Sequence, residues 1–403
     1  MPEAVIVATA RSPIGRAFKG SLVDMRPDDL SVQMIQAVLA KVPQLPPAEI
    51  EDLILGCGLP GGEQGFNMAR VVSILAGLPD VPGTTVNRYC SSSLQTIRMA
   101  AHAIRAGEGD AFIAAGVETV SRFVKGNSDS LPDTTNPRFL QAEARSAERA
   151  NGDRGPWEPA DGLPDIYIAM GQTAENVADT CKVTREEMDA YALQTQQKVG
   201  RALEQGFFEK DITPVTLPDG RVVSADDGPR PQTTAEDLAK LKPAFRPNGR
   251  VTAGNACPLN DGAAAVVLMS DTRARELGIK PLARVISSGV SALNPEIMGL
   301  GPIEACRKAL ARAGMTIDDI ELIEINEAFA AQVIPSAAEL GISWDKLNVS
   351  GGAIALGHPF GMTGARIMST LINNLTEHDK TIGMETMCVG GGQGMSMIIE
   401  RLS

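Results

Sequence analysis

The central stretch of this sequence reads Thr85-Val86-Asn87-Arg88-Tyr89-Cys90-Ser91-Ser92-Ser93-Leu94-Gln95. A short apolar segment leads into Cys90, and the helical pattern that follows the three serines ends at Gly107. This predicts a strand, a tight turn and a buried helix, with Cys90 in the turn. A thiol at that place faces the free N–H groups of a helix start, which favours the thiolate. The alternative interpretation is a small apolar cysteine of the core.

The order of elements around this stretch recurs in the second half of the chain. The predicted strands are 4–8, 50–57 and 111–116 in the first half and 281–288, 320–325 and 381–384 in the second. Helices open at Pro27 and at Pro302, and residues 347–351 fall where the strand before Cys90 falls. The equivalent segments lie roughly 260 to 280 residues apart, which indicates a duplicated α/β unit.

Residues 121–250 fit neither repeat, because they are more polar and rich in Pro, Asp and Gly. They include one clear helix that Thr184 caps, with Glu187 completing a capping box. We interpret the segment as an insertion over the open face of the core. It serves either as a ligand-holding lid or as a surface for oligomer contacts. The predicted domains are an N-terminal half of 1–120 plus 251–275, an inserted loop domain of 121–250, and a C-terminal half of 276–403.

Composition narrows the class of protein. The chain has 403 residues and a net charge of −12, which argues against a nucleic-acid partner but leaves room for a phosphate-bearing ligand. None of its six cysteines forms a Cys-x-x-Cys pair, so we expect no structural metal and no disulfide framework. No apolar run is long enough to span a membrane, and the N-terminus shows no leader pattern, so we expect a cytoplasmic protein.

Three further groups of residues add chemistry to Cys90. The first is His358, in the glycine-rich stretch 351–364, where a constrained ring can serve as a base or a hydrogen-bond donor. The second is Asn326, which follows a predicted strand. The third is Cys388 with the glycines after it, whose unhindered N–H groups suit an oxyanion. The alternatives are a structural histidine, a turn asparagine and a small residue in a tight loop.

These residues resemble the thiolases over essentially the whole chain. The matching signatures are Asn87-Arg88-Tyr89-Cys90-Ser91-Ser92, Gly116-Val117-Glu118, Val251-Thr252-Ala253-Gly254-Asn255-Ala256, Asn326-Glu327-Ala328-Phe329-Ala330, Gly357-His358-Pro359 and Cys388-Val389-Gly390-Gly391-Gly392. The resemblance implies a duplicated α/β/α/β/α core. The forms of 87–92 and 170–177 are most similar to degradative 3-ketoacyl-CoA thiolases, acyltransferases of fatty acid β-oxidation.

The resemblance also implies a role for each residue of the set. Cys90 matches the nucleophile that becomes acylated, and His358 matches the residue that activates it. Cys388 matches the acid/base, and Asn326 matches the residue that holds a water in one oxyanion hole. The N–H groups of Cys90 and Gly390 match the other hole. A soft nucleophile that attacks a ketone and leaves as a thioester suits a retro-Claisen cleavage.

Ligands and partners follow from the same resemblance. Coenzyme A is expected as a co-substrate, with no permanently bound cofactor. The CoA contacts are expected at Arg230, Phe245, Ala253 and Cys257, and the pantetheine and acyl pocket at Met170, Met298 and Phe329. A homodimer or homotetramer is expected, and a separate hydratase-dehydrogenase chain is a further candidate partner.

Some positions depart from the family pattern. Ser93 stands where Gly is more frequent, and Cys257-Pro258 replaces a usual Ser-Gly, which puts acyl-chain preference in doubt. Ala169 stands where short-chain enzymes usually have His, which favours longer substrates. The remaining alternatives are a short-chain acetyl-CoA C-acetyltransferase, a β-ketoacyl synthase, and a non-catalytic lipid carrier of similar fold. Cys388 argues against the synthase, and the complete catalytic set argues against the carrier.

Overall fold

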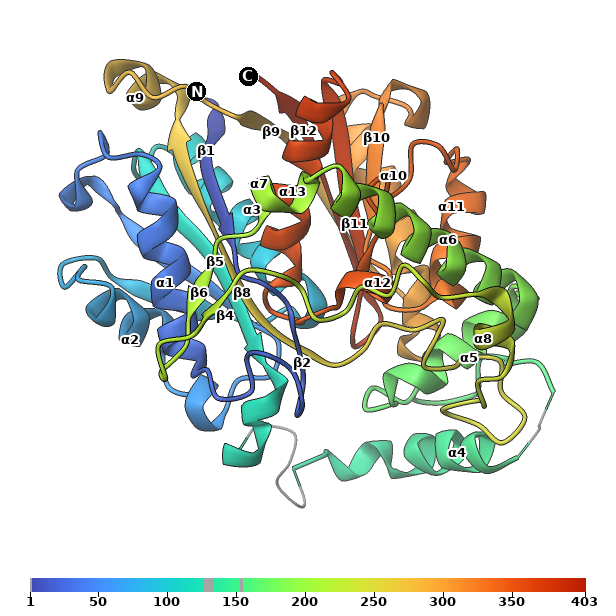
Figure 1. Cartoon of the computed structure of the whole chain (residues 1–403). Coiled ribbons are helices and arrows are strands. Elements are labelled where there is room, and N and C mark those ends of the chain that lie inside the picture. Colours follow the sequence, from blue (N-terminus) through green and yellow to red (C-terminus); the bar gives the residue numbers. More distant parts are fainter. Residues whose placement is uncertain (1, 127–133, 153–154) are drawn as a thin grey trace.

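The computed structural model describes residues 2–126, 134–152 and 155–403. A ten-stranded sheet runs through the molecule (Figure 1). Its strands are β1 Ala4–Arg11, β2 Gly15–Arg16, β3 Asp52–Cys57, β4 Gly83–Val86, β5 Ala111–Thr119, β8 Asn260–Ser270, β9 Ala283–Ala292, β10 Leu322–Ile325, β11 Ile382–Val389 and β12 Gln393–Arg401. The main helices of the core are α1 Pro27–Ala40, α2 Met68–Leu75, α3 Ser92–Ala106, α10 Gly301–Ala313, α11 Ala330–Leu340, α12 Ala353–Leu356 and α13 Thr363–Glu377.

The strand order is symmetric about the sheet's centre. Outward from β1 the order is β8, β5, β3, β4, and outward from β9 it is β12, β11, β10. The pairings match as well, because β3–β5 and β10–β11 are parallel while β5–β8 and β11–β12 are antiparallel. Within the sheet, the two halves join where β1 pairs with β9, through Val5 with Arg284 and Ile6 with Ala283. The predicted duplication of an α/β unit is confirmed.

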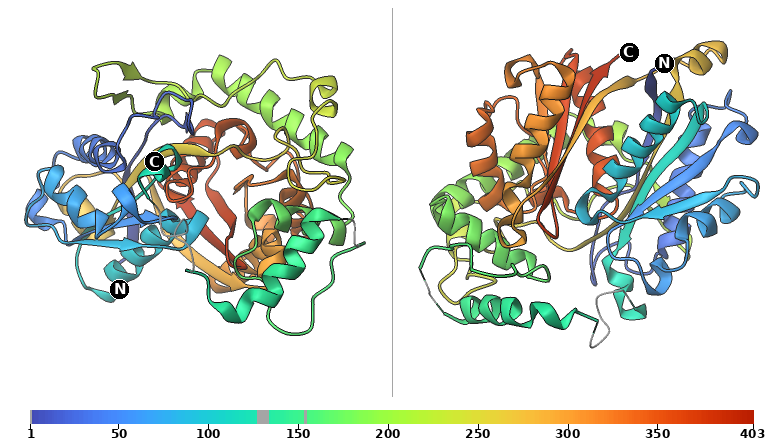
Figure 2. Two further views of the ribbon diagram at one scale, coloured as in Figure 1. Left: turned by 90° about the horizontal axis from the view of Figure 1, so that it is seen from below. Right: turned by 180° about the vertical axis from the view of Figure 1, so that it is seen from behind.

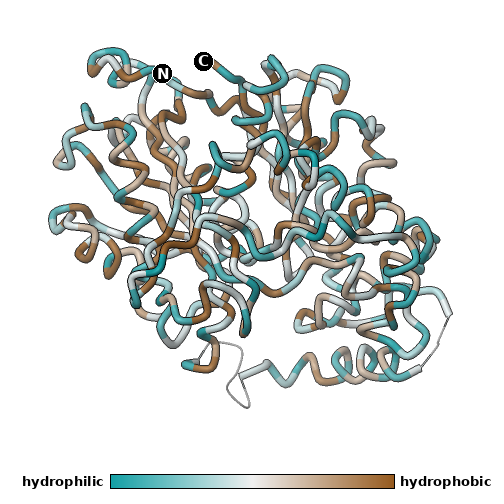
Figure 3. Tube along the Cα trace, in the orientation of Figure 1, coloured by the Kyte–Doolittle hydropathy of each residue, from teal (hydrophilic) through white to brown (hydrophobic). Residues whose placement is uncertain are grey.

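The helices form three layers around the two halves of the sheet. Helices α3 and α13 contact each other in the middle, between the halves (Figures 1 and 2). Helices α1 and α2 cover the outer face of the first half, and α10 covers that of the second, with α11 packed beside it. This is the expected α/β/α/β/α arrangement. Hydrophobic residues lie along the interior strands, and hydrophilic residues concentrate on outward loops and helix faces (Figure 3).

The segment between β5 and β8 lies outside the large sheet. Its elements are α4 Leu140–Asn151, α5 Met170–Thr180, α6 Arg185–Glu204, α7 Phe207–Asp211, α8 Ala235–Ala239 and the small pair β6 Val215–Thr216 and β7 Val222–Val223. The capping box of Thr184 and Glu187 is present at the start of α6, as predicted. Residues 127–133 and 153–154 of the predicted insertion lie outside the described residues, and its boundaries stay a prediction.

Helix α6 packs on the second half, where it contacts α11 and α12. By contrast, α4 lies at the margin of the molecule, away from the sheet (Figures 1 and 2). The insertion therefore meets the core mainly through α5 and α6. Among the described residues, no helix combines the length and the apolar character that crossing a membrane requires.

One predicted equivalence holds only in part. Residues 347–351 fall where β4 and the Cys90 turn fall in the first half, but they form no strand, and only Leu347 bridges to Ile323. The reason is Asn348, whose backbone φ is +44°. Its side chain accepts the N–H of Ile325 at 2.9 Å and donates to the carbonyl of Ile325 at 3.0 Å. A buried amide thus takes the place of a strand partner beside β10.

Candidate active site

The turn that carries Cys90 is a short 3₁₀ segment, Tyr89–Ser91, between β4 and α3. Tyr89 has a φ of +43°, which a side chain other than Gly adopts only where its surroundings hold it. Here Asn87 Oδ1 accepts the N–H of Tyr89 at 2.7 Å, and Ser92 Oγ accepts the N–H of Arg88 at 2.9 Å. The polar residues around the cysteine therefore fix the turn, and Cys90 lies at the start of α3 as predicted.

The ionisation of Cys90 differs from the prediction. Burial raises the pKa of its thiol to about 12, even though the backbone N–H groups of Gly390 and of Cys90 itself hydrogen-bond to the sulfur and lower the pKa. The helix-start contacts that favour a thiolate are present, but the loss of hydration outweighs them. The predicted effect of the helix start is therefore present but does not decide the ionisation, and Cys90 needs a base to remove its proton.

A second thiol lies against the first. Cys388 is the penultimate residue of β11 and is fully buried. The pKa of Cys388 is raised well above its usual value by burial and by the nearby Cys90 and Cys257 sulfurs. Gly390 follows Cys388 and provides the N–H that reaches Cys90. The end of β11 thus brings both a protonated thiol and a backbone N–H donor to the Cys90 sulfur.

The hydrogen bonds of His358 determine its tautomer. The hydroxyl of Thr363 donates to the carbonyl of Pro359 at 2.7 Å, so it accepts from His358 Nδ1 at 2.6 Å. Nδ1 therefore carries the proton, and Nε2 is an acceptor that receives a hydrogen bond from Asn326 Nδ2 at 3.3 Å. Burial and the positive charge of Arg366 lower the pKa of His358 to about 3, which keeps the ring neutral.

Two buried carboxylates hold the loops that carry these groups. Glu118 accepts the N–H groups of Gly58 at 2.8 Å and of Gly361, in the His358 loop, at 3.0 Å. Glu327 accepts the N–H of Ile354 at 3.1 Å and lies next to Asn326 in the chain. Sequence reasoning assigned no role to either carboxylate or to Thr363. All three lie inside or beside motifs that it quoted, and that proximity was the available signal.

A cavity of about 430 Å³ contains two of the predicted CoA contacts. It is lined by Arg16, Gln196, Gly228, Arg230, Gln232, Thr233, Asp237, Leu238, Leu241, Ala253, Gly254, Pro258 and Ile354. Arg230 and Ala253 belong to this wall, as does Pro258, one of the residues that departs from the family pattern. Residues from the inserted segment and from the core therefore meet around one space.

The predicted acyl-pocket residues gather beside the second thiol. Met298 and Phe329 belong to one buried apolar cluster with Cys388. The ring of Phe245 packs edge-on against Phe329, with 6.1 Å between centroids. Met170 packs against the same cluster. The three predicted acyl-pocket residues are thus brought together with Phe245, a predicted CoA contact, and the roles of all four toward a ligand stay predictions.

Two residues that depart from the family pattern, Cys257 and Ser93, make defined contacts in the structure. The N–H of Cys257 donates to the carbonyl of Ala328 at 3.0 Å, and burial together with the nearby Cys90 sulfur raises the pKa of the Cys257 thiol. Ser93 Oγ accepts the N–H of Ala365 at 2.9 Å and thereby joins α3 to α13. A third thiol is therefore part of this site, and Ser93 has a structural use.

Comparison with known proteins gives a consistent result. The family descriptions "Thiolase, N-terminal domain" and "Thiolase, C-terminal domain" match residues 4–272 and 279–401. The chain is 44% identical to a 3-ketoacyl-CoA thiolase of Bacillus subtilis, over 99% of this chain and 100% of the relative. It is 42% identical to the 3-oxoadipyl-CoA/3-oxo-5,6-dehydrosuberyl-CoA thiolase of Escherichia coli, over the full length of both. The dimeric peroxisomal thiolase of Saccharomyces cerevisiae superposes with a TM-score of 0.88 at 36% identity, over 99% of this chain and 97% of that one.

Proposed function

This chain belongs to the thiolase family, and we propose that it cleaves 3-ketoacyl-CoA with CoA to give acetyl-CoA and a shortened acyl-CoA. The observation that supports the proposal is a pair of neighbouring buried thiols, Cys90 and Cys388, and we assign Nε2 of His358 as the base that serves them. The N–H of Gly390 on the Cys90 sulfur supports an oxyanion hole at the same place.

The first half-reaction forms the acyl-enzyme. His358 Nε2 accepts the proton of Cys90, and the sulfur attacks the 3-keto carbon of the substrate. The bond between C2 and C3 then breaks, which leaves the acyl group on Cys90 and the enolate of acetyl-CoA as leaving group. Cys388 donates its thiol proton to C2 of that enolate, a step that suits a group kept protonated by burial.

The second half-reaction reverses these proton movements. The Cys388 thiolate accepts the proton of the incoming CoA thiol, whose sulfur attacks the acyl carbon on Cys90. The Cys90 sulfur leaves and regains a proton from His358. In both halves the developing oxyanion needs donors. We assign these to the N–H groups of Cys90 and Gly390 and to a water held by Asn326, whose Oδ1 has no protein partner among the described residues.

We propose that the inserted segment 121–250 contributes to CoA binding. Arg230 is a suitable phosphate partner at the wall of the 430 Å³ cavity, and Ala253 lies on the same wall. We also propose a homo-oligomer, which the dimeric state of the yeast structural relative supports. Light scattering at a known concentration tests the oligomer, and a monomer would contradict it. A hydratase-dehydrogenase partner stays a prediction.

The physiological substrate is either a fatty acyl chain or a dicarboxylic one. The Bacillus subtilis relative favours fatty acid β-oxidation, our first proposal. The Escherichia coli relative favours a 3-oxoadipyl-type chain that ends in a carboxylate, as in aromatic-compound degradation. Both use the same chemistry at Cys90, so the difference lies in the acyl pocket near Met298 and Phe329.

The deciding experiment follows the CoA-dependent loss of 3-ketoacyl-CoA absorbance with three substrates. A medium-chain 3-ketoacyl-CoA cleaved with the highest kcat/KM supports β-oxidation, and 3-oxoadipyl-CoA cleaved best supports the second candidate. Preference for acetoacetyl-CoA moves the enzyme to the short-chain acetyltransferases. Mass spectrometry of enzyme quenched without CoA checks the acyl group on Cys90. Absence of cleavage and of acylation with all three substrates contradicts the proposed function.

A further inference from the structure

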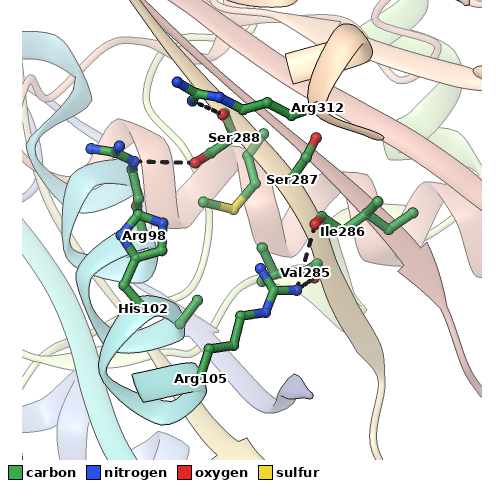
Figure 4. Close-up of a pocket in the computed structure, with 10 residues that line it drawn as sticks. Arg98, His102, Arg105, Val285, Ile286, Ser287, Ser288 and Arg312 are labelled. Atoms are coloured by element: carbon green, nitrogen blue, oxygen red, sulfur yellow. Dashed lines mark hydrogen bonds between the residues drawn. The ribbon is translucent and has the colours of Figure 1, made fainter. Parts of the chain in front are cut away.

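A second hollow, which none of the thiols lines, lies between helix α3 and strand β9 (Figure 4). Its volume is about 260 Å³. It is lined by Arg98, Ala101, His102, Arg105, Val285, Ile286, Ser287, Ser288, Arg312 and Met397. None of these residues lines the cavity with Arg230, so the two spaces are separate. The catalytic proposal gives this pocket no use.

Positive charge is concentrated in this pocket. Figure 4 shows Arg98, His102 and Arg105 rising from one helix, with Arg312 approaching from the opposite side. Arg105 pairs with Glu3 at 3.3 Å. Within the described part of the chain, neither Arg98 nor Arg312 forms an ion pair. Three guanidinium groups and an imidazole therefore share one small space with a single carboxylate at its edge.

Hydrogen bonds to neutral acceptors hold the guanidinium groups of Arg98 and Arg312 in place without neutralising them. Arg98 Nε donates to Ser288 Oγ at 3.1 Å, and Arg312 Nη1 donates to the Ser288 carbonyl at 2.6 Å. Arg105 donates to the carbonyl of Val285. The terminal NH₂ groups of Arg98 make no hydrogen bond to described residues. Donors are thus pre-positioned by neutral acceptors and remain available to a ligand.

The pKa values of two basic groups in this pocket are lowered, and a bound anion would raise them again. Burial and the nearby Arg88 and Arg312 lower the pKa of Arg98, and burial followed by the three pocket arginines lowers the pKa of His102. In both groups burial is the larger cause, and repulsion from the neighbouring positive charges adds to it. This concentration of positive charge is local to the pocket, since the chain as a whole carries a net charge of −12.

We propose that this pocket binds a compact oxyanion of the phosphate class, as inorganic phosphate or as the phosphate group of a small ester. Planar guanidinium forks match tetrahedral oxyanions through paired N–H donors. The volume is below the roughly 300 to 1,000 Å³ of pockets that enclose whole drug-sized ligands, so a phosphate group fits better than an entire nucleotide. Arg98 follows Cys90 by eight residues, which is roughly 12 Å along α3. The site is therefore independent of the proposed acyl transfer.

Isothermal titration of the full chain with inorganic phosphate, at constant pH and ionic strength, tests the site. We expect saturable binding that Arg98→Gln and Arg312→Gln each weaken about tenfold, the size of one lost charged hydrogen bond. The matched control is Arg275→Gln, which removes the same charge from an exposed position on α9, Asp271–Glu276. Equal weakening by the control, or no saturable binding by the wild type, overturns the proposal.

Further measurements identify which phosphate compound binds, and they keep the test informative if a variant misfolds. Arg98→Lys keeps the positive charge but removes the planar guanidinium group. It therefore tests the paired N–H donors, or fork, even if the Gln variants do not fold. It is expected to bind phosphate more weakly than the wild type, and unchanged affinity overturns the fork geometry. Tighter binding of glycerol phosphate than of inorganic phosphate assigns the site to an ester, and the reverse assigns it to the free ion. If Arg98→Gln alters only the oligomeric state and the wild type binds no phosphate, the residues serve an interface between copies and the proposal is wrong.

Discussion

The two halves of the sheet share a topology but differ in what their strand ends carry. Leu53 in β3 and Ile323 in β10 occupy equivalent places, since each faces the outer helices. Three residues further along, the first half has Gly56 and the second has Asn326. Duplication has preserved the strand positions, but not the chemistry at their ends.

The same contrast holds for the neighbouring strands. Leu53 pairs with Ile113, and Ile323 pairs with Met384. Four residues further along, the first half has the apolar Val117 where the second has Cys388. The connections to the central helices differ too, because residues 87–91 lead to α3 while 348–362 lead to α13. The longer connection carries His358, so in the second half a loop adds to the residues that the strand ends contribute.

The largest expected effect is on the single reactive group of the first half. Cys90→Ala should reduce kcat by at least about 10⁴-fold, because no other thiol occupies the start of α3. CoA binding, measured by titration, should persist. The control is Cys306→Ala, which alters another fully buried cysteine and should keep near-wild-type turnover. If the Cys90→Ala variant still cleaved substrate at the wild-type rate, Cys90 would not be the nucleophile. The proposed chemical difference between the two halves would then be wrong.

The second effect compares Cys388 with Val117, the residue at the equivalent position of the first half. Cys388→Ala should lower kcat about 10²- to 10⁴-fold, the range for loss of a general acid and base. Val117→Ala, the matched change in the other half, should lower the free energy of unfolding by roughly 2 kcal/mol and leave kcat close to wild type. Steady-state kinetics and urea unfolding of both variants give the comparison. Similar kcat losses in the two variants would mean that the halves are not chemically distinct.

A third effect follows from the buried imidazole of the second half. The pKa of His358 is about 3 in the folded protein and about 6.5 in the unfolded chain. Between these values the unfolded chain binds more protons, so the free energy of unfolding falls as pH falls from 6.5 towards 3. This residue contributes a slope of up to about 1.4 kcal/mol per pH unit.

His358→Asn should therefore flatten the decline of stability in that window, as measured by urea unfolding at several pH values. His378→Asn is the control, because this histidine is exposed at the end of α13. The inference about a neutral ring fails if the two variants show the same pH dependence. It holds if only the His358 variant differs from the wild type.

The architecture was predictable because its signals are local. The strand patterns, the Thr184 capping box and the glycines that end α3 and α10 all lie within a few residues of what they control. The residues of the proposed catalytic set could also be named from the sequence, since each sits in a short motif, and their roles stay predictions. The same order of segments recurs at a nearly constant spacing, and this identified the two halves as equivalent without any knowledge of the contacts between them.

What escaped prediction depends on residues that are distant in sequence. Asn348 replaces a strand by bonding to Ile325, a pairing no periodicity reveals. The protonation of Cys90 depends on burial by the whole fold, which outweighed the local helix-start effect. The basic pocket needs α3, β9 and α10 together, and none of these segments is unusual by itself.

The smallest expected effect compares the ends of the two central helices. Helix α3 is followed by Gly107 at a φ of +78°, whereas α13 is followed by His378 and then Asp379 at a φ of +48°. A methyl group at Gly107 would meet no atom within 4 Å, so Gly107→Ala should cost only the conformational energy, about 1 kcal/mol.

Asp379→Gly should have the opposite sign, a gain of about 0.5 kcal/mol, because Gly is the preferred residue at such helix ends. The ion pair that it loses, with Arg401, offsets little, since the Asp379 side chain is 93% exposed. Both changes lie at the far end of their helix from the thiols, roughly 22 Å along α3, so neither should alter kcat. Thermal unfolding and kinetics of the pair test this. A fall in kcat in folded Gly107→Ala would mean that the end of α3 controls the position of Cys90, and that scaffold and chemistry are not separable in the first half.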